Sequence, residues 1–285
     1  MRLTISAVLW SVAAISSVHA SAKPDAVIPL VAYQGKFDTI HATIGGHEGT
    51  FLFDTGEGVT MISPKVASNA GCTPWANITG FRMTGERLDS PRCDGQEFRI
   101  EGAVFKAPSI GVFDIMALMG KGAPQLDGSV GLDIFAGKTI TLDPVHHQII
   151  VESAASLAER TAHATEVPVR LVRDAEGLAI SVDMGVHTSS GTAWMELDTG
   201  NGGPTVFVSR EVAPTLSLDP QKIFPDIKDP QPVAFDVAKD ISFKGNARVM
   251  KGLIMDGNIG MQFLKDWNLT LDLAAGRAWL APATP

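Results

Sequence analysis

The chain has 285 residues, of which only 19% are charged, and a formal net charge of −8 at pH 7. This length accommodates one large domain or two of moderate size, enough to bury a substantial core. The acidic balance and the lack of any basic run in the sequence argue against a nucleic-acid-binding protein. Low charge together with many Gly, Val, Ile and Thr residues favours short strands joined by glycine turns over long helices.

Residues 1–20 are predicted to form a secretory signal peptide. Arg2 supplies a positive charge, an apolar stretch runs from Leu3 to Ile15, and Val18-His19-Ala20 fits a small-x-small cleavage site. The apolar stretch is too short and too serine-interrupted for a membrane span, although a retained N-terminal anchor stays open as an alternative. We therefore expect an exported chain, secreted or in a bacterial periplasm, with no membrane span after cleavage.

The first half is predicted to contain strands that lead into an Asp-Thr-Gly tripeptide. Residues 40–44 alternate apolar and polar side chains, as half-buried strands do. The apolar residues 51–53 then run directly into Asp54-Thr55-Gly56. After a further short apolar run, Ser63 followed by Pro64 predicts the N-cap and first residue of a short helix.

Cys72 and Cys93 are the two cysteines of the chain. In an exported protein, two cysteines at this modest separation are expected to form a disulfide. A catalytic thiol is the alternative, but no Cys-His motif marks a partner histidine for either residue.

The second half repeats the same signals in the same order. Asp198-Thr199-Gly200 again follows an apolar run, and Ser209 begins a segment that parallels the predicted helix start. Farther downstream, residues 127–143 align without gaps to residues 256–272. We therefore expect two strand-rich lobes, residues 21–152 and 167–285. Residues 153–166, rich in Ala, Ser and Glu, form the expected linker, in which a helical turn is possible.

Two aspartates that follow matching apolar runs suggest a catalytic pair. Carboxyl groups about 3 Å apart cannot both ionise easily, so they share one proton at moderately acid pH. The ionised partner then acts as general base, and the protonated partner as general acid, on one reacting centre. A glycosidase with two carboxylates is an alternative, but it does not explain why Thr and Gly follow both aspartates.

Each half of the chain contains two hydrophobic residues followed by Asp-Thr-Gly and, farther downstream, a hydrophobic residue followed by Gly. With this pattern present twice in the same order, the chain resembles the aspartic peptidases, both pepsin-like and retropepsin-like. The resemblance covers nearly the whole chain after residue 20. It implies an all-β, bilobal acid protease fold with two pseudo-twofold-related, barrel-like lobes and short helices. It also implies a monomer, because one chain carries both aspartates.

The resemblance implies a role for each matching residue. Asp54 and Asp198 would form the catalytic dyad that activates a water molecule. The threonines would bond across the lobe interface, the first glycines would let backbone amides approach the carboxylates, and the downstream glycines would let the chain pass beneath each loop. These supporting residues are Thr55, Gly56, Gly131, Thr199, Gly200 and Gly260.

Two residues depart from the family pattern. Glu57 and Asn201 follow the tripeptides where active family members usually carry Ser, Thr or Ala. Glu57 would either bring a third carboxylate beside the dyad, which raises the cost of ionisation, or point outward into solvent. Asn201 would donate a hydrogen bond to Asp198.

The pepsin-type flap tyrosine is also missing, because the only tyrosine, Tyr33, precedes the first Asp-Thr-Gly. A candidate flap spans Thr79 to Glu86. It contains Phe81, and Gly80 and Gly85 are expected at its bends.

The sequence thus predicts an aspartic endopeptidase that acts on a peptide or protein substrate and needs neither cofactor nor metal. His146 and His147 are interpreted as turn residues, because a metal site would need further ligands at defined spacing. The alternative is a catalytically degenerate protein of the same fold that binds peptides without cutting them.

Overall fold

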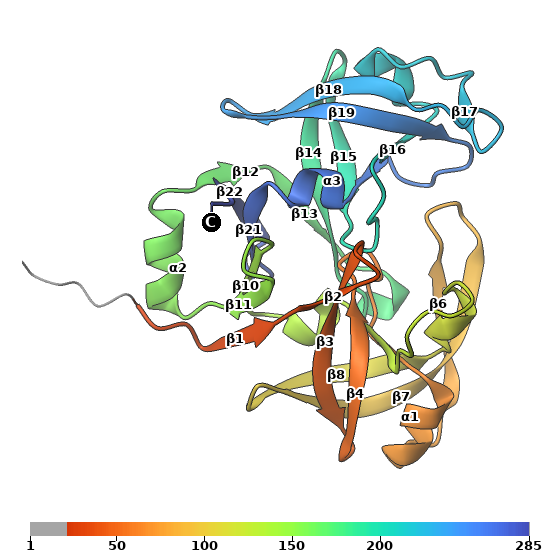
Figure 1. The fold of residues 1–285 in the computed structure, drawn as a ribbon, viewed down its shortest axis with the longest axis vertical. Helices are drawn as coiled ribbons and strands as arrows, with labels where there is room; N and C mark the ends of the chain where they lie inside the picture. The colour runs from red at the N-terminus through yellow and green to blue at the C-terminus, as the bar shows by residue number, and fades with distance from the viewer. Residues whose placement is uncertain (1–21, 285) are drawn as a thin grey trace, which may run out of the picture.

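A computed structural model describes residues 22–284 as a β-rich chain folded into two lobes (Figure 1). The predicted all-β, bilobal architecture is confirmed. The predicted signal peptide, residues 1–20, lies outside the described residues. Among residues 22–284, no helix combines the length and the apolar character needed to cross a membrane.

The first lobe is a closed barrel. Its six-stranded ring runs β3-β4-β9-β5-β8-β7 and closes because β7 also pairs with β3. Two pairs in the ring are parallel, β4 with β9 and β5 with β8. The strands of this lobe are β2 (Val31–Tyr33), β3 (Phe37–Ile44), β4 (His47–Phe53), β5 (Met61–Ile62), β6 (Trp75–Phe81), β7 (Arg87–Ile100), β8 (Ala103–Val112) and β9 (Gly128–Val130).

The second lobe repeats this topology. Its ring runs β14-β15-β20-β16-β19-β18 and closes through the pairing of β14 with β18. The parallel pairs are now β15 with β20 and β16 with β19. The strands are β13 (Val169–Val172), β14 (Ser181–Thr188), β15 (Gly191–Leu197), β16 (Val206–Ser209), β17 (Ile223–Phe224), β18 (Gln231–Ala238), β19 (Ile241–Met250) and β20 (Gly257–Ile259).

A third sheet is built from both halves of the chain. Its order is β1-β11-β10-β21-β22-β12, and the halves meet where β10 pairs with β21. At that junction the hydroxyl groups of Thr141 and Thr270 lie 2.8 Å apart. The strands are β1 (Ala26–Pro29), β10 (Thr139–Asp143), β11 (Gln148–Val151), β12 (Thr165–Val167), β21 (Trp267–Asp272) and β22 (Arg277–Pro282).

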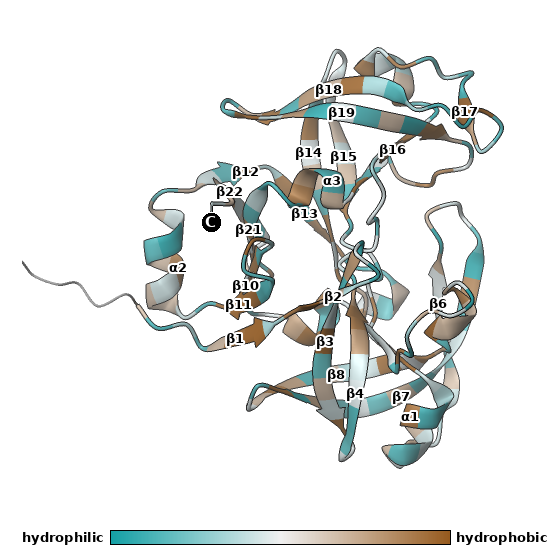
Figure 2. Cartoon of the chain, viewed as in Figure 1, coloured by the Kyte–Doolittle hydropathy of each residue, from teal (hydrophilic) through white to brown (hydrophobic). Residues whose placement is uncertain are grey.

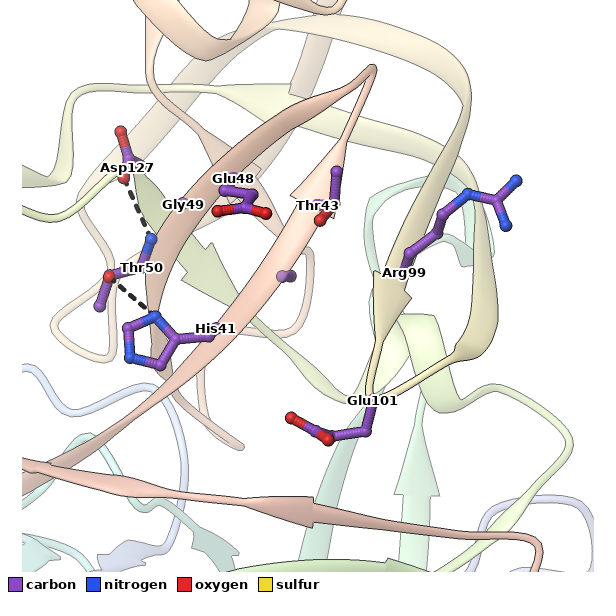
Figure 3. Close-up of a pocket in the computed structure, with 9 residues that line it drawn as sticks. His41, Thr43, Glu48, Gly49, Thr50, Arg99, Glu101 and Asp127 are labelled. Atoms are coloured by element: carbon purple, nitrogen blue, oxygen red, sulfur yellow. Dashed lines mark hydrogen bonds between the residues drawn. The ribbon is translucent and has the colours of Figure 1, made fainter.

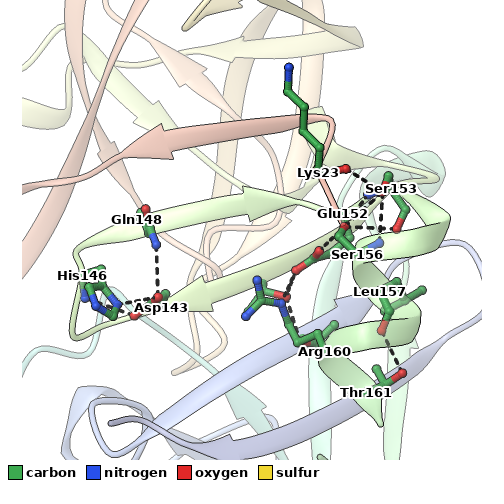
Figure 4. Close-up of polar contacts among 12 residues, drawn as sticks. Lys23, Asp143, His146, Gln148, Glu152, Ser153, Ser156, Leu157, Arg160 and Thr161 are labelled. Carbon is green, nitrogen blue, oxygen red and sulfur yellow. Dashed lines mark hydrogen bonds and ion pairs between the residues drawn. The ribbon is translucent and has the colours of Figure 1, made fainter. Parts of the chain in front are cut away.

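A buried carboxylate ties the expected linker to this shared sheet (Figure 4). Helix α2 (Ala154–Thr161) occupies most of the linker and begins at the capping box of Ser153. Glu152 accepts hydrogen bonds from Thr141 Oγ1 at 2.7 Å and from Ser156 Oγ at 2.6 Å, and it forms an ion pair with Arg160. Helix α2 is therefore fastened to β10 through Glu152, the buried acid that directly precedes the linker, because both carboxylate oxygens of Glu152 are paired.

The short helix expected after each Asp-Thr-Gly differs between the lobes. In the first lobe, α1 (Pro64–Asn69) begins as predicted, and Ser63 Oγ accepts from Val66 N at 3.2 Å. In the second, Ser209 Oγ accepts from Val212 N, but only the 3-10 helix η4 (Ala213–Leu216) follows. The other helices are η1 (Ile115–Ala117), η2 (Leu132–Phe135), η3 (Ala175–Gly177) and α3 (Met261–Leu264).

Apolar side chains fill the two barrels. In the first lobe, Phe51 and Phe98 meet edge to face with their ring centroids 5.7 Å apart. Figure 2 shows hydrophobic and hydrophilic residues along β18, where Val233, Phe235 and Val237 alternate with more exposed positions. This period of two puts one face of each strand into the core.

The predicted disulfide between Cys72 and Cys93 is confirmed, with the two Cα atoms 6.0 Å apart. It joins the segment that enters β6 to the middle of β7. The bond therefore closes the base of the β6–β7 hairpin, which carries the predicted flap.

Candidate active site

The two Asp-Thr-Gly loops meet between the barrels and bond to each other crosswise. Thr55 N donates to Thr199 Oγ1, and Thr199 N donates to Thr55 Oγ1, both at 3.0 Å. Each hydroxyl also donates into the opposite lobe, Thr55 Oγ1 to Leu197 O at 2.7 Å and Thr199 Oγ1 to Phe53 O at 3.2 Å. These four bonds hold the loops in mutual register.

Gly56 and Gly200 leave room for the aspartate of the opposite loop. A Cβ atom at Gly56 would lie 2.7 Å from Asp198 Cγ, and one at Gly200 would lie 2.6 Å from Asp54 Cγ. Both distances are far below an ordinary carbon–carbon contact of about 3.5 Å. The backbone also approaches the carboxylate, since Gly56 N donates to Asp54 Oδ1 at 2.9 Å.

The two dyad carboxyl groups have unequal surroundings. Burial and the neighbouring Asp198 raise the pKa of Asp54 well above its ordinary value. Asp198, which is 6% exposed, accepts hydrogen bonds at both oxygens, from Asn201 N at 3.1 Å and from Asn258 Nδ2 at 2.7 Å. Donors on both oxygens favour the ionised form. The surroundings thus favour a proton on Asp54, whereas Asp198 is held by two hydrogen-bond donors.

Gly131 and Gly260 lie directly beneath the two loops. A Cβ atom at Gly131 would lie 3.4 Å from the backbone of Gly58, and one at Gly260 would lie 2.6 Å from Asn201 Cβ. Gly131 N also donates to Thr60 Oγ1 at 3.0 Å. Because the contact at Gly260 leaves no space for a side chain, only glycine at this position lets the chain pass so close beneath the loop.

The dyad lines a cavity of about 400 Å³ between the lobes. Asp54, Asp198 and both loop glycines Gly56 and Gly200 line it. Apolar side chains of the first lobe cover one side of the cavity: Met61, Leu88, Phe113, Ile115, Leu118 and Met119. The acids therefore lie beside an apolar surface that suits hydrophobic side chains of a peptide.

The predicted flap is the β6–β7 hairpin, and its tip reaches this cavity. Phe81, which is 61% exposed, and Met83 both line it. Gly85 forms the turn with φ of 81°. Gly80 lies within β6, paired with Leu88, so the expected bend at Gly80 is wrong. Thr79 is also in the strand, and its hydroxyl donates to Asp89 Oδ1 at 2.6 Å.

The hairpin also contacts the second lobe. Ile254 N donates to Met83 O at 2.9 Å. Nearer the base, Arg92 Nη1 lies 3.1 Å from Glu176 Oε2 of η3. Since these bonds join segments of opposite lobes, the hairpin bridges the cleft.

The comparisons with known proteins agree with this geometry. Residues 40–134 match the aspartyl protease family. The match lies in the first lobe, contains Asp54-Thr55-Gly56, and supports the resemblance expected from the sequence. No curated protein matches the chain.

Solved structures extend the likeness to both lobes. Basic 7S globulin from soybean covers 90% of this chain and 95% of its own, with a TM-score of 0.55 and 11% identity. Conglutin gamma, a basic 7S globulin from lupine seeds, covers 91% and 95%, with a TM-score of 0.56 and 10% identity. At these identities the likeness concerns the fold alone, and both proteins are named as globulins rather than as peptidases.

Glu57 faces the dyad instead of solvent. It lines the same cavity as Asp54, and its Oε1 accepts a hydrogen bond from Ser129 Oγ of β9. Burial and the charge of Asp54 raise the pKa of Glu57 well above its ordinary value. Of the two orientations left open by the sequence, the structure therefore has the one that brings a third carboxyl group to the dyad.

Asn201 reaches Asp198 through its backbone amide and not through its side chain. The Asn201 side chain donates to Asn258 Oδ1 at 2.9 Å. Asn258 Nδ2 in turn donates to Asp198 Oδ2 at 2.7 Å and to Glu196 Oε2 at 3.2 Å. The expected donation from Asn201 thus comes from its backbone, and Asn258 supplies the side-chain donor.

Sequence reasoning missed two further buried acids. Glu196, two residues before Asp198, lines the cavity, and burial followed by the charges of Asp198 and Asp54 raises its pKa to about 9. Asp133 accepts from Thr60 Oγ1 at 2.6 Å, and burial raises its pKa to about 6. One signal pointed to Glu196: a charged residue stands where the first half has Leu52.

Other polar groups expected at the surface do lie there. His146 and His147 have side chains that are 56% and 55% exposed, and each contacts one aspartate. Among residues 22–284, no group of three or more His, Cys, Asp or Glu side chains is arranged to hold a metal.

A second hollow of about 510 Å³ lies on the first barrel, away from the dyad (Figure 3). Its lining includes His41, Thr50 and Asp127, and Thr50 forms a hydrogen bond with each of the other two. Asp127 Oδ2 accepts from Thr50 N at 3.0 Å, and Asp256 accepts from Trp194 N at 2.8 Å in the second lobe. Each aspartate therefore accepts from the backbone of the strand that leads into the Asp-Thr-Gly loop of its own lobe.

Proposed function

We propose that the chain is an aspartic endopeptidase that hydrolyses peptide bonds in the cleft between its lobes. One observation carries the proposal. The crosswise bonding of the Asp-Thr-Gly loops places Asp54 and Asp198 together on the floor of a cavity that also has an apolar side. The family match of the first lobe supports it.

The unequal surroundings of the two carboxyl groups assign their roles. Asp198, held by two donors, is the ionised group that takes a proton from a water molecule in the cleft. Asp54 holds a proton and donates it to the oxygen of the scissile carbonyl as water attacks the carbon. The resulting tetrahedral diol collapses when Asp198 passes its proton to the amide nitrogen, Asp54 takes a proton back from a diol hydroxyl, and the carbon–nitrogen bond breaks.

The surroundings of the cleft indicate how a peptide would enter. The hydrogen bond from Ile254 N to Met83 O must open to admit a chain across the dyad. The apolar residues of the first lobe, among them Met61, Leu88 and Phe113, favour bulky hydrophobic side chains next to the scissile bond. Since one chain supplies both aspartates, we propose that it acts as a monomer, and that it does so after export.

Cleavage of an unfolded protein across about pH 3 to 8 tests the proposal, in a range that brackets carboxyl-dyad behaviour. We expect the purified chain to cleave, and Asp54→Asn and Asp198→Asn each to lose about a thousandfold or more of the activity, because each removes half of the shared-proton pair. Asp229→Asn, at an exposed position, is the matched control and should retain full activity. Full activity in either dyad variant would refute the assignment.

The second candidate is a peptide-binding protein that does not cut. The presence of Glu57 in the cavity favours it, because a third acid adds to the cost of ionising the dyad. A folded chain that binds a statine-containing peptide but cleaves nothing at any pH would select this candidate. Cleavage that the statine peptide inhibits would select the endopeptidase.

A further inference from the structure

Leu52 and Glu196 occupy equivalent positions of the repeat but differ in chemistry. Leu52 lies in β4 and Glu196 in β15, each two residues before the dyad aspartate of its lobe. Each is paired with the equivalent strand beneath the loop, Leu52 with Ser129 of β9 and Glu196 with Asn258 of β20. Both Leu52 and Glu196 line the cavity that holds the dyad. Because the lobes repeat one topology about the dyad, the two residues lie on opposite sides of it.

The two sides of the cavity differ in the same way as these two residues. On the first side, Leu52 packs with Ile115 and Met119, which also line the cavity. The second lobe contributes two acids, one glycine and one apolar side chain to the lining: Glu196, Asp198, Gly200 and Met255. A peptide that crosses the dyad would thus meet an apolar wall on one side of its scissile bond and Glu196 on the other.

The carboxyl group of Glu196 is held in place but has one oxygen free. The residue is 9% exposed, and its Oε2 accepts a hydrogen bond from Asn258 Nδ2 at 3.2 Å. Among residues 22–284, its Oε1 has no hydrogen-bond partner. Burial, followed by the charges of Asp198 and Asp54, raises the pKa of Glu196 to about 9, so the group is protonated at acid and neutral pH. A protonated carboxyl group can both donate and accept a hydrogen bond.

The surroundings of Glu196 limit the substrate side chain that suits it. An apolar side chain would leave the free oxygen with neither water nor a partner, which costs free energy. A carboxylate would add a further negative charge beside Asp54 and Asp198. An ammonium group would stabilise the anionic form of Asp198 and so weaken the base that takes a proton from water. A primary amide is uncharged, and it can accept from the carboxyl group and donate to it.

We propose that Glu196 is a specificity-determining residue that selects a primary amide side chain, Asn or Gln, on the side of the scissile bond that faces the second lobe. The inference rests on the proposed endopeptidase function. Leu52 and its apolar neighbours take a hydrophobic side chain on the other side of the bond. The expected cleavage site therefore joins a bulky hydrophobic residue to Asn or Gln, whereas two apolar walls would favour two hydrophobic residues.

Peptides with one fixed Leu and one variable residue at the scissile bond test the inference. The variable residue is Gln, Leu, Lys or Glu, and both orders along the peptide are used. In one order, we expect the parent chain to cleave the Gln peptide with a kcat/KM about tenfold above that of the Leu peptide, since one buried hydrogen bond has that effect. Equal values for Gln and Leu in both orders, or a highest value for Lys or Glu, would overturn the inference.

Two substitutions separate the hydrogen bond from the other effects of the residue. Glu196→Leu copies position 52 of the first lobe and should turn the preference towards the Leu peptide. Glu196→Gln keeps a donor and an acceptor and should keep the preference for the Gln peptide. Because each ratio is taken within one variant, a general loss of activity cancels. Glu48→Leu, at an exposed position in the hollow of Figure 3, is the control and should leave the ratio unchanged.

The affinity of statine-containing peptides with Gln or Leu at the variable position tests the subsite without turnover. We expect the Gln form to bind the parent chain about tenfold more tightly, and Glu196→Leu to lose this difference. A parent chain that binds with this preference but cleaves nothing would overturn the endopeptidase and leave the subsite standing. Cleavage with the same Gln-to-Leu ratio in the parent chain and in Glu196→Leu would overturn this inference and leave the endopeptidase standing. A folded chain that neither binds nor cleaves these peptides would overturn both.

Discussion

The two lobes share one loop geometry above the cavity floor and differ in the layer beneath it. On the first side, Ser129 holds Glu57, whose second oxygen is unpaired. On the second side, Asn201, Asn258 and Asp198 form a connected chain of hydrogen bonds. Close approach of the aspartates requires the loops to match, whereas the layer beneath is free to differ. In the proposed mechanism, this difference is the reason for giving Asp54 the role of acid and Asp198 the role of base.

Apart from substitution of the aspartates themselves, the largest expected effect comes from the loop geometry that the lobes share. Gly200→Ala and Gly56→Ala each place a methyl group against the opposite aspartate, 2.6 Å from Asp54 Cγ and 2.7 Å from Asp198 Cγ. We expect each to lower kcat by about a hundredfold, because displacement of a reacting group by about 1 Å has that consequence. Steady-state kinetics on folded variants checks this.

Gly203→Ala is the matched control for these variants. It lies in the same loop as Gly200, and an added Cβ atom there would have its nearest contact at 3.3 Å, with Asn201 Oδ1. Equal losses in Gly200→Ala and Gly203→Ala would mean that general disturbance of the loop, and not the aspartate contact, is responsible.

Substitutions in the layer beneath the loops should have a smaller effect, and the effect should differ between the two lobes. Asn258→Leu removes a fully buried amide that donates to Asp198 and Glu196 and accepts from Asn201. Its loss leaves several buried groups unpaired, so we expect about 2 kcal/mol less stability. Ser129→Ala removes one hydrogen bond to Glu57 and should cost about 1 kcal/mol.

Urea unfolding of both variants measures this asymmetry. The larger loss of stability in Asn258→Leu should be accompanied by a larger fall in kcat, because Asn258 touches a dyad carboxylate and Ser129 does not. Equal effects of the two substitutions would show that the two supporting layers are equivalent in energy, and would remove the basis for placing the charge on Asp198.

The last expected effect is a pH dependence of stability, which is small for each pH unit but extends over several units. The pKa of Glu196 is raised from 4.5 to about 9 by burial and by its acidic neighbours. The folded chain thus holds a proton that the unfolded chain loses above about pH 4.5, and this stabilisation disappears as pH rises towards 9. The contribution changes by on the order of 1 kcal/mol per pH unit in that window.

Unfolding measured from pH 5 to 9 should therefore show stability falling with rising pH, and falling less in Glu196→Gln. Asp133, with a pKa of about 6, adds to the fall at the acid end in both proteins. A parent chain and a Glu196→Gln variant with parallel curves would mean that Glu196 titrates normally.

Most of the fold and the dyad could be predicted because the repeat marks them twice. The Asp-Thr-Gly copies and the strand alternation around them predicted two strand-rich lobes and both catalytic candidates, and the resemblance to the aspartic peptidases predicted that the lobes are barrels. The cysteine pair was predictable because two cysteines allow one pairing. Gly80 was misplaced because a glycine in a strand looks, in sequence, like a glycine at a bend.

The partners beneath the loops could not be predicted, because they depend on which strands become neighbours. Ser129 is an ordinary residue in a short apolar run, and nothing local shows that β9 lies under Glu57. The direction of the Glu57 side chain likewise follows from tertiary packing. Glu196 is the exception. It stands two residues before the second Asp-Thr-Gly, where the first half has Leu52, so a comparison of the two halves would have revealed a charged residue in place of an apolar one.

The shared sheet has a consequence for how this chain can be divided. Strand β10 of the first half pairs along its edge with β21 of the second half, from Thr139 with Asp272 to Leu142 with Leu269. A fragment cut at α2 would leave that edge open, and an open edge recruits another strand. Because the halves are repeats, we expect the N-terminal fragment to recruit a second copy of itself, with two β10 strands joined about a twofold axis. The matching edges of β10 and β21 also make co-expression of the two fragments a route to a reconstituted molecule.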